Sequence, residues 1–147
     1  MFVKEVLARK GNEVKKVDPE ETIEVAAALM RLERIGALVV SGADGALDGV
    51  LSEKDVVRAI ADCGARALRM KVADFMDRKP TICSAEDTVA KVARTMTLHR
   101  ARHVPVMEQD RVAGLISIGD VVRDRFEEME LERDTLRDIA LSHQLAG

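Results

Sequence analysis

Apolar residues recur along the chain at one spacing that is typical of helices and at another that is typical of strands. Between residues 22 and 32 they stand three or four positions apart, and the same stripe returns between residues 88 and 98, which predicts two amphipathic helices. A short extended segment at 14–17 precedes the first stripe. Two apolar runs around a Gly/Asp turn at 42–45 follow it and predict a β-hairpin.

The chain contains this pattern twice. The copies align at a step of 66 residues, and at a step of 65 after a one-residue deletion in a loop. Residues 3–10, ahead of the first copy, resemble residues 72–79, ahead of the second. Three blocks in the same order indicate duplication, so we place the first repeat at 1–66, the second at 67–128 and a C-terminal helical extension at 129–147. Matched positions include Thr22 and Thr88, Met30 and Met96, Gly49 and Gly114, Ser52 and Ser117, and Asp55 and Asp120.

Polar residues indicate where the helices begin. Asp18 and Ser84 each stand three positions before an acidic residue, which is the spacing of a helix-entry signal for the first helix of each copy. Ser52 and Ser117 directly follow the hairpins, so we expect them to cap the second helix of each copy.

The last segment departs from the repeat. Its apolar positions alternate at steps of three and four on a strongly charged background, which predicts a long helix with a single apolar seam. Such a seam either folds back on its own domain or contacts a second copy, and the sequence leaves both open. The seam is Val122, Phe126, Met129, Leu136, Ala140 and His143, interrupted by Arg133.

Composition narrows the function. The net charge is -3, which argues against nucleic acid as the main partner, and an aromatic content of 2% makes a base-stacking platform hard to build. Cys63 and Cys83 have neither disulfide nor zinc-site spacing. No apolar run reaches the length of a membrane span, and the first residues lack a signal-peptide pattern. We therefore expect a cytoplasmic protein that binds neither membrane nor nucleic acid.

Catalytic chemistry has little support in the sequence. His99 and His103 have the spacing of a helical metal pair, but no Glu lies between them and His103 is expected in a strand. Neither capping serine lies in a GxSxG motif, and no phosphate-binding glycine motif is present. We expect no metal and no catalytic residue, and a small enzyme built on the region 99–103 is the least favoured hypothesis.

Two segments carry a family resemblance. Residues 49–57 and 114–122 each read glycine, two apolar residues, Ser, two variable positions and Asp, which resembles the signature of cystathionine-β-synthase (CBS) domains. Residues 102–106 and 81–87 are similar to further parts of such a repeat. The chain is thus identified as a stand-alone tandem CBS-domain protein. The resemblance implies an α/β (α+β) fold of two pseudo-symmetric βαββα repeats packed through their sheets, plus the C-terminal helix, and a homodimer shaped as a flat disc.

The Ser and Asp of each signature have a chemical rationale. They project from one side of the first helical turn, where an ionised carboxylate accepts hydrogen bonds from ribose hydroxyls and the helix N-terminus suits a phosphate. The resemblance implies Asp on ribose, and Ser with backbone on sugar or phosphate. The alternative is that these residues are only helix caps and first-turn acids.

The second site is richer in cations than the first, because Arg102 and His103 stand where the first copy has Gly36 and Ala37. We therefore expect the Asp120 site to be the better phosphate binder. Candidates for sugar and phosphate are Ser52, Asp55, Arg100, Arg102, His103, Ser117 and Asp120. Candidates for an apolar slot around adenine are Ile35, Leu38, Ile82 and Val104, with an ordinary core role as the alternative. Thr81 and Lys16 resemble positions where CBS domains approach the base or phosphate.

The expected function is regulatory rather than enzymatic. The resemblance implies two clefts that bind an adenosine-containing ligand (AMP, ADP, ATP, NAD(H) or S-adenosylmethionine), sense energy or redox state, and act in trans on an unknown regulated protein. The alternative is a structural dimerisation protein with vestigial clefts, held to its partner by the seam at 122–143.

Overall fold

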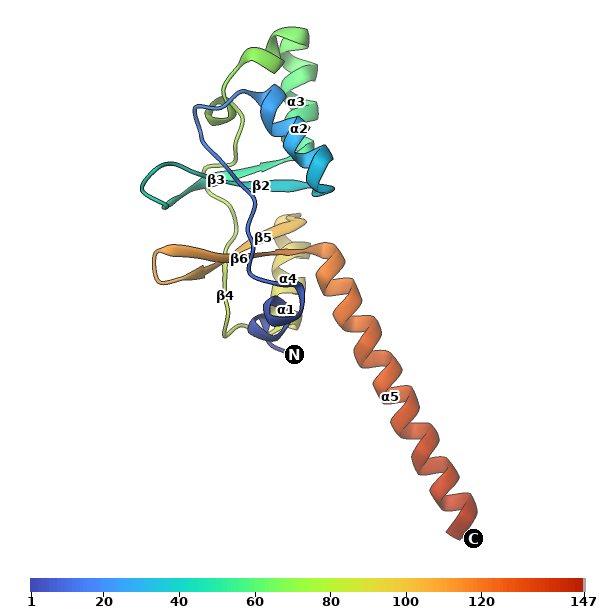
Figure 1. The fold of residues 1–147 in the computed structure, drawn as a ribbon. Helices are drawn as coiled ribbons and strands as arrows, with labels where there is room; N and C mark the ends of the chain where they lie inside the picture. Colours follow the sequence, from blue (N-terminus) through green and yellow to red (C-terminus); the bar gives the residue numbers. More distant parts are fainter. Residues whose placement is uncertain (147) are drawn as a thin grey trace.

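Two βαββα repeats and a long C-terminal helix make up the computed structural model, which describes residues 1–146 (Figure 1). This confirms the predicted fold class. The first repeat is β1 (Lys16–Val17), α2 (Ile23–Glu33), β2 (Ala37–Ser41), β3 (Leu47–Ser52) and α3 (Glu53–Cys63). The second is β4 (Cys83–Ser84), α4 (Val89–His99), β5 (His103–Glu108), β6 (Arg111–Ser117) and α5 (Ile118–Ala146). Helix α1 (Val3–Lys10) precedes them, and the 3-10 helices η1 (Gly64–Arg69) and η2 (Val72–Asp74) connect them.

The two sheets have the same topology. In each, a two-residue strand runs parallel to the first strand of an antiparallel hairpin, in the orders β1-β2-β3 and β4-β5-β6. Both hairpins shift register at the same place, after Val40 in one and after Val106 in the other. The hairpins lie next to each other, with α2 and α3 beyond the first and α1 and α4 beyond the second (Figure 1).

The first helix of each repeat begins later than Asp18 and Ser84 predicted. Thr22 caps α2 by accepting a hydrogen bond from the Val25 amide at 3.2 Å, and Thr88 caps α4 in the same way. The prediction was wrong because short polar side chains also close turns. Asp18 Oδ1 accepts from the Glu20 amide at 2.8 Å, which forms a turn ahead of the helix.

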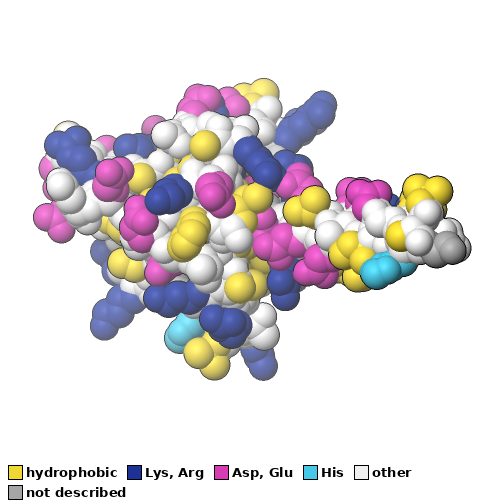
Figure 2. All heavy atoms as spheres, turned by 90° about the horizontal axis from the view of Figure 1, so that it is seen from below, with side chains coloured by type: hydrophobic (Ala, Val, Ile, Leu, Met, Phe, Trp, Pro, Cys, Tyr) yellow, Lys and Arg dark blue, Asp and Glu magenta, His cyan; other side chains and the backbone are white. Residues whose placement is uncertain are grey.

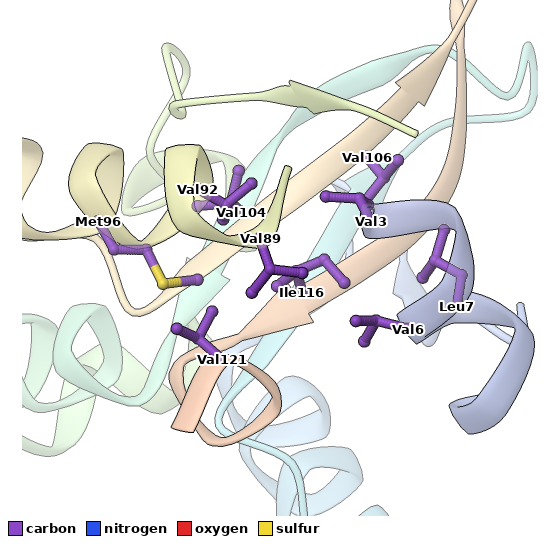
Figure 3. Close-up of a cluster of buried hydrophobic side chains, with 10 residues drawn as sticks. All are labelled: Val3, Val6, Leu7, Val89, Val92, Met96, Val104, Val106, Ile116 and Val121. Atoms are coloured by element: carbon purple, nitrogen blue, oxygen red, sulfur yellow. The ribbon is translucent and has the colours of Figure 1, made fainter. Parts of the chain in front are cut away.

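Each hydrophobic core includes the segment that precedes the other repeat in the sequence. Val3, Val6 and Leu7 of α1 pack into the core of the second repeat (Figure 3). Val72 and Met76 pack into the core of the first. The predicted units 1–66 and 67–128 therefore describe the order along the chain, whereas the folded cores exchange the blocks 3–10 and 72–79.

Helix α5 is continuous from Ile118 to Ala146, without a break where the extension was predicted to begin. It leaves the body of the molecule (Figure 1), and every residue from Met129 to Ala146 is exposed. Of the two alternatives that the sequence left open, the structure does not show the seam folded back on its own domain over residues 129–146. Among residues 1–146, no helix has both the length and the apolar character needed to cross a bilayer.

Candidate functional site

A serine and an aspartate cap the second helix of each repeat. Asp55 Oδ2 accepts hydrogen bonds from the Ser52 amide and hydroxyl, both at 2.9 Å. Asp120 Oδ2 accepts from the Ser117 amide at 2.8 Å and from its hydroxyl at 3.0 Å. The predicted capping role of both serines is confirmed. Each aspartate uses the same oxygen for the cap, which leaves Oδ1 as the oxygen available to a ligand hydroxyl.

Lys10 distinguishes the second site from the first. From the end of α1, its Nζ donates to Asp120 Oδ2 at 2.7 Å and to the Leu115 carbonyl at 2.8 Å. At the first site the nearby cation is Arg58, whose guanidinium lies 4.0 Å from Asp55 Oδ1. Sequence reasoning missed Lys10. Lys10 lies in the leading block 3–10, at the position equivalent to Lys79. This position would have indicated a role at the second site only if residues 3–10 were known to pack on the second repeat.

The Asp120 carboxylate is held in its ionised form. Burial by itself would raise its pKa, but the hydrogen bonds from Lys10 and Ser117 outweigh burial, so the pKa lies below its ordinary value. An ionised carboxylate only accepts hydrogen bonds. The site therefore presents a fixed acceptor at neutral pH.

His103 brings the two repeats together at this point. A Cβ on Gly36 of the first repeat would lie only 3.1 Å from the His103 ring and 3.6 Å from Glu53 Oε1. The backbone holds both sides in place, because the Glu53 amide donates to the Gly36 carbonyl at 3.0 Å and the Ile118 amide to the Arg102 carbonyl at 2.8 Å. A side chain at position 36 would therefore push the His103 ring aside by a few tenths of an ångström, so Gly36 favours a close approach between the repeats.

The environment of His103 is strongly charged. Burial lowers its pKa, the negative charges of Glu53 and Asp120 oppose this, and the positive charges of Lys10 and Arg102 add to it. The imidazole is consequently neutral at pH 7. We call the set Lys10, Glu53, Arg102, His103, Ser117 and Asp120 the Asp120 cluster; Glu53, contributed by the first repeat, was not predicted from sequence.

A small hollow of about 70 Å³ adjoins the Asp120 cluster. It is too small for a purine but has a cationic wall. One of its carboxylates, Asp124, is only 4% exposed, and its Oδ1 has no hydrogen-bond partner within residues 1–146. Burial and the neighbouring charge of Glu128 raise the pKa of Asp124. The lining residues are Val6, Arg9, Lys10, Asp120, Arg123 and Asp124.

The other predicted ligand residues lie outside the Asp120 cluster. Val104 and Leu38 are 0% exposed in the two cores, so a nucleobase would contact them only by displacing core side chains. Ile35 lines a hollow of about 440 Å³ between α2 and α3. Ile82 is 53% exposed. Thr81 is half-buried, whereas Lys16 and Arg100 are exposed.

Other reactive side chains do not assemble. In the part of the chain that the structure describes, no three His, Cys, Asp or Glu side chains are grouped to hold a metal ion. His99 lies in α4 and His103 in β5, so they do not form a helical pair. Cys63 and Cys83 are free thiols, and burial raises the pKa of Cys83 to about 11.

Comparison with known proteins gives consistent matches. The profile of the CBS domain matches residues 3–62 and 72–127. The sequence is 36% identical over 108 residues to the CBS domain-containing protein CBSX3, mitochondrial, of Arabidopsis thaliana. The match covers 71% of this chain and 52% of that protein, so this chain spans about half the length of that relative.

Solved structures resemble the fold along most of its length. The CBS-domain containing protein ATU1752 from Agrobacterium tumefaciens superposes with a TM-score of 0.83 at 43% identity, over 85% of this chain and 99% of that one. The CBS domain pair of protein MJ0100, in complex with 5′-methylthioadenosine and S-adenosyl-L-methionine, superposes with a TM-score of 0.78, over 87% of this chain and 98% of that one. Its identity is 22%, so this second likeness concerns the fold alone.

Proposed function

The chain belongs to the CBS-domain family, with two copies of the domain, and on this premise we propose that it is a regulatory module that binds an adenosine-containing ligand beside Asp120. The observation that carries the proposal is the Asp120 cluster. An ionised acceptor and three cationic or imidazole side chains meet there, contributed by α1 and the second repeat, with Glu53 and Gly36 of the first repeat alongside.

The chemistry of the cluster fits a nucleotide in two parts. Asp120 Oδ1 accepts a ribose hydroxyl, a charge-assisted bond that contributes about 1.5–3 kcal/mol. Arg102, Lys10 and Arg123 supply cations for a phosphate, and the planar guanidinium groups suit bidentate contacts. AMP, ADP, ATP, NAD(H) and S-adenosylmethionine share the ribose and differ in the tail. The cationic wall favours the ligands that carry phosphate.

The first site is the weaker one in this proposal. Asp55 and Ser52 repeat the capping geometry, but Gly36 and Ala37 replace Arg102 and His103. Because the His103 imidazole is neutral, the difference in charge comes from Arg102, and the loss of this cation gives a phosphate less to bind. We expect the Asp120 site to fill at lower ligand concentration than the Asp55 site.

Regulation follows if the ligand prefers one arrangement of the repeats. Because His103 packs against Gly36 across the two repeats, a ligand beside His103 contacts the place where their relative position is set. A preference of about 1–3 kcal/mol is enough for a useful switch. The regulated protein acts as a separate chain in this scheme.

A second copy of the chain is the expected structural partner. Large apolar side chains are exposed at equivalent positions of the two repeats, with Leu32 at 79% and Leu98 at 78% on α2 and α4, and Val57 at 66% and Val122 at 47% on α3 and α5. Exposed apolar surface of this extent is typical of an interaction surface. The homodimer would cover the helical faces and leave the Asp120 cluster between the repeats.

Thermal unfolding with AMP, ADP, ATP, NADH and S-adenosylmethionine tests the proposal. A true ligand at a hundredfold excess over Kd stabilises the fold by about 2.7 kcal/mol. Asp120→Asn should lose most of this shift and Asp55→Asn less, whereas Asp87→Asn, which changes a similar turn acid outside the Asp120 cluster, should retain it. If none of the five ligands shifts the wild-type midpoint, the ligand-binding proposal is wrong.

The exposed α5 favours a second function, that of a structural dimerisation protein. Its seam at 122–143 is available to a partner. In that case, the chain would self-associate through α5 while none of the five ligands binds, so mass in solution and ligand titration together separate the two functions.

A further inference from the structure

The exposed part of α5 has an uncovered apolar face. Figure 2 shows hydrophobic side chains distributed along the whole projecting helix. On the predicted seam, Phe126 is 62% exposed, Met129 64% and Leu136 67%. In proteins, a helix takes most of its stability from packing of one apolar face rather than from its intrinsic propensity. The exposed apolar face of α5 is therefore suited to pack against a partner.

The seam has the spacing of a coiled coil. Alternating steps of three and four place Phe126, Arg133 and Ala140 at the a positions of three heptads. The d positions are Val122, Met129, Leu136 and His143. The seam is continuous with Ile118 and Val122, which are 46% and 47% exposed on the body of the second repeat.

The charges beside the seam match a second copy of the same helix. In a parallel pair, a g residue faces the e residue of the next heptad on the partner. Arg125 then faces Glu130, and Glu132 faces Arg137, and the two-fold symmetry makes each pair twice. An antiparallel pair with Arg133 facing Met129 of the partner would instead place Glu132 against its own copy.

We infer that α5 forms a parallel, in-register coiled coil with α5 of a second copy of this chain. Arg133 at an a position lowers the stability of such a seam but fixes its register, and Glu132 on the partner lies beside it. This inference does not depend on ligand binding. It specifies that the two second repeats lie on the same side of the dimer.

Disulfide trapping in the full chain tests the geometry. In a Cys63→Ser, Cys83→Ala background, Leu136→Cys places a thiol at a d position, and Leu131→Cys places one off the seam at similar exposure, 68% against 67%. Mild oxidation should give a covalent dimer for Leu136→Cys and little for Leu131→Cys. A monomer in solution, a dimer that Leu136→Cys does not trap, or equal trapping by both variants would overturn the inference.

Charge exchange tests the orientation. Glu132→Arg and Arg137→Glu each replace attraction by repulsion across the parallel pair, and we expect dimer dissociation constants to rise about tenfold. The double variant should return to within about threefold of wild type. Neither single change weakens the helix itself, because Arg at 132 follows Glu128 by four residues and Glu at 137 follows Arg133 by four. Double-variant weakening equal to the sum of the singles would overturn the parallel arrangement.

Discussion

Lys10 and Asp120, 110 residues apart in sequence, form an ion pair with 2.7 Å between Nζ and Oδ2. The pair joins the end of α1 to the beginning of α5. The carboxylate proposed for ribose is consequently oriented before any ligand arrives, and the cation beside it is already in place for a phosphate.

Lys10→Met should separate the two roles of this ion pair. We expect affinity for ATP or AMP to fall about tenfold, because a phosphate loses a charge-assisted contact, while affinity for adenosine changes little. Lys79→Met, at the equivalent position of the other leading block, should leave both unchanged. Isothermal titration measures the affinity of each variant for ATP and for adenosine. An equal loss of affinity for both ligands in Lys10→Met would contradict a phosphate role for Lys10.

His103 should make stability depend on pH. Its folded-state pKa lies below the ordinary value of 6.5, so the unfolded chain binds a proton more readily, and stability falls as pH drops from about 6.5 toward the lowered pKa. His103→Gln should remove this part of the pH profile. Urea unfolding between pH 5 and pH 8 measures it, with His99→Gln, at the exposed end of α4, as control. A profile unchanged in His103→Gln would disprove the assignment.

Asp124→Asn should stabilise the protein at neutral pH. The ionised carboxylate is buried with one oxygen unpaired, which costs about 1–3 kcal/mol, and the neutral amide avoids part of that cost. We expect a gain of about 1 kcal/mol. Because the folded pKa is raised, the gain should disappear as pH falls below the ordinary value of 3.8. The exposed Asp138→Asn on the same helix serves as control, and a less stable Asp124→Asn would refute the argument.

Two equivalent glycines should respond differently to alanine. A Cβ at Gly49 would lie 2.5 Å from the Asp77 carbonyl oxygen, a backbone atom that accepts a hydrogen bond from Val50. A Cβ at Gly114 would meet the Leu7 Cδ2 atom, also at 2.5 Å, at the end of a flexible side chain. We expect Gly49→Ala to cost about 3 kcal/mol and Gly114→Ala about 1 kcal/mol. Chemical denaturation of both variants measures the difference, and equal costs would contradict it.

Local patterns in the sequence predicted the fold and part of the site. The repeat is a local pattern that occurs twice, and the Ser52 and Ser117 caps depend on residues three positions apart. Both could therefore be predicted from the sequence. The start of α2 was predicted wrongly from Asp18, because an Asp side chain can close a turn as well as cap a helix.

The remaining site residues could not be found in this way. Lys10 and Glu53 reach the Asp120 cluster from α1 and from the other repeat, and no spacing in the sequence encodes a meeting between such distant segments. The burial of Val104 similarly depends on α1 covering the second repeat.

The exchange of leading segments has a consequence for folding. A fragment ending near residue 66 would lack Val72 and Met76, and a fragment starting there would lack Val3, Val6 and Leu7. Neither half has a complete interior, so the two halves form one cooperative folding unit, and whatever tightens one of them protects the other from unfolding.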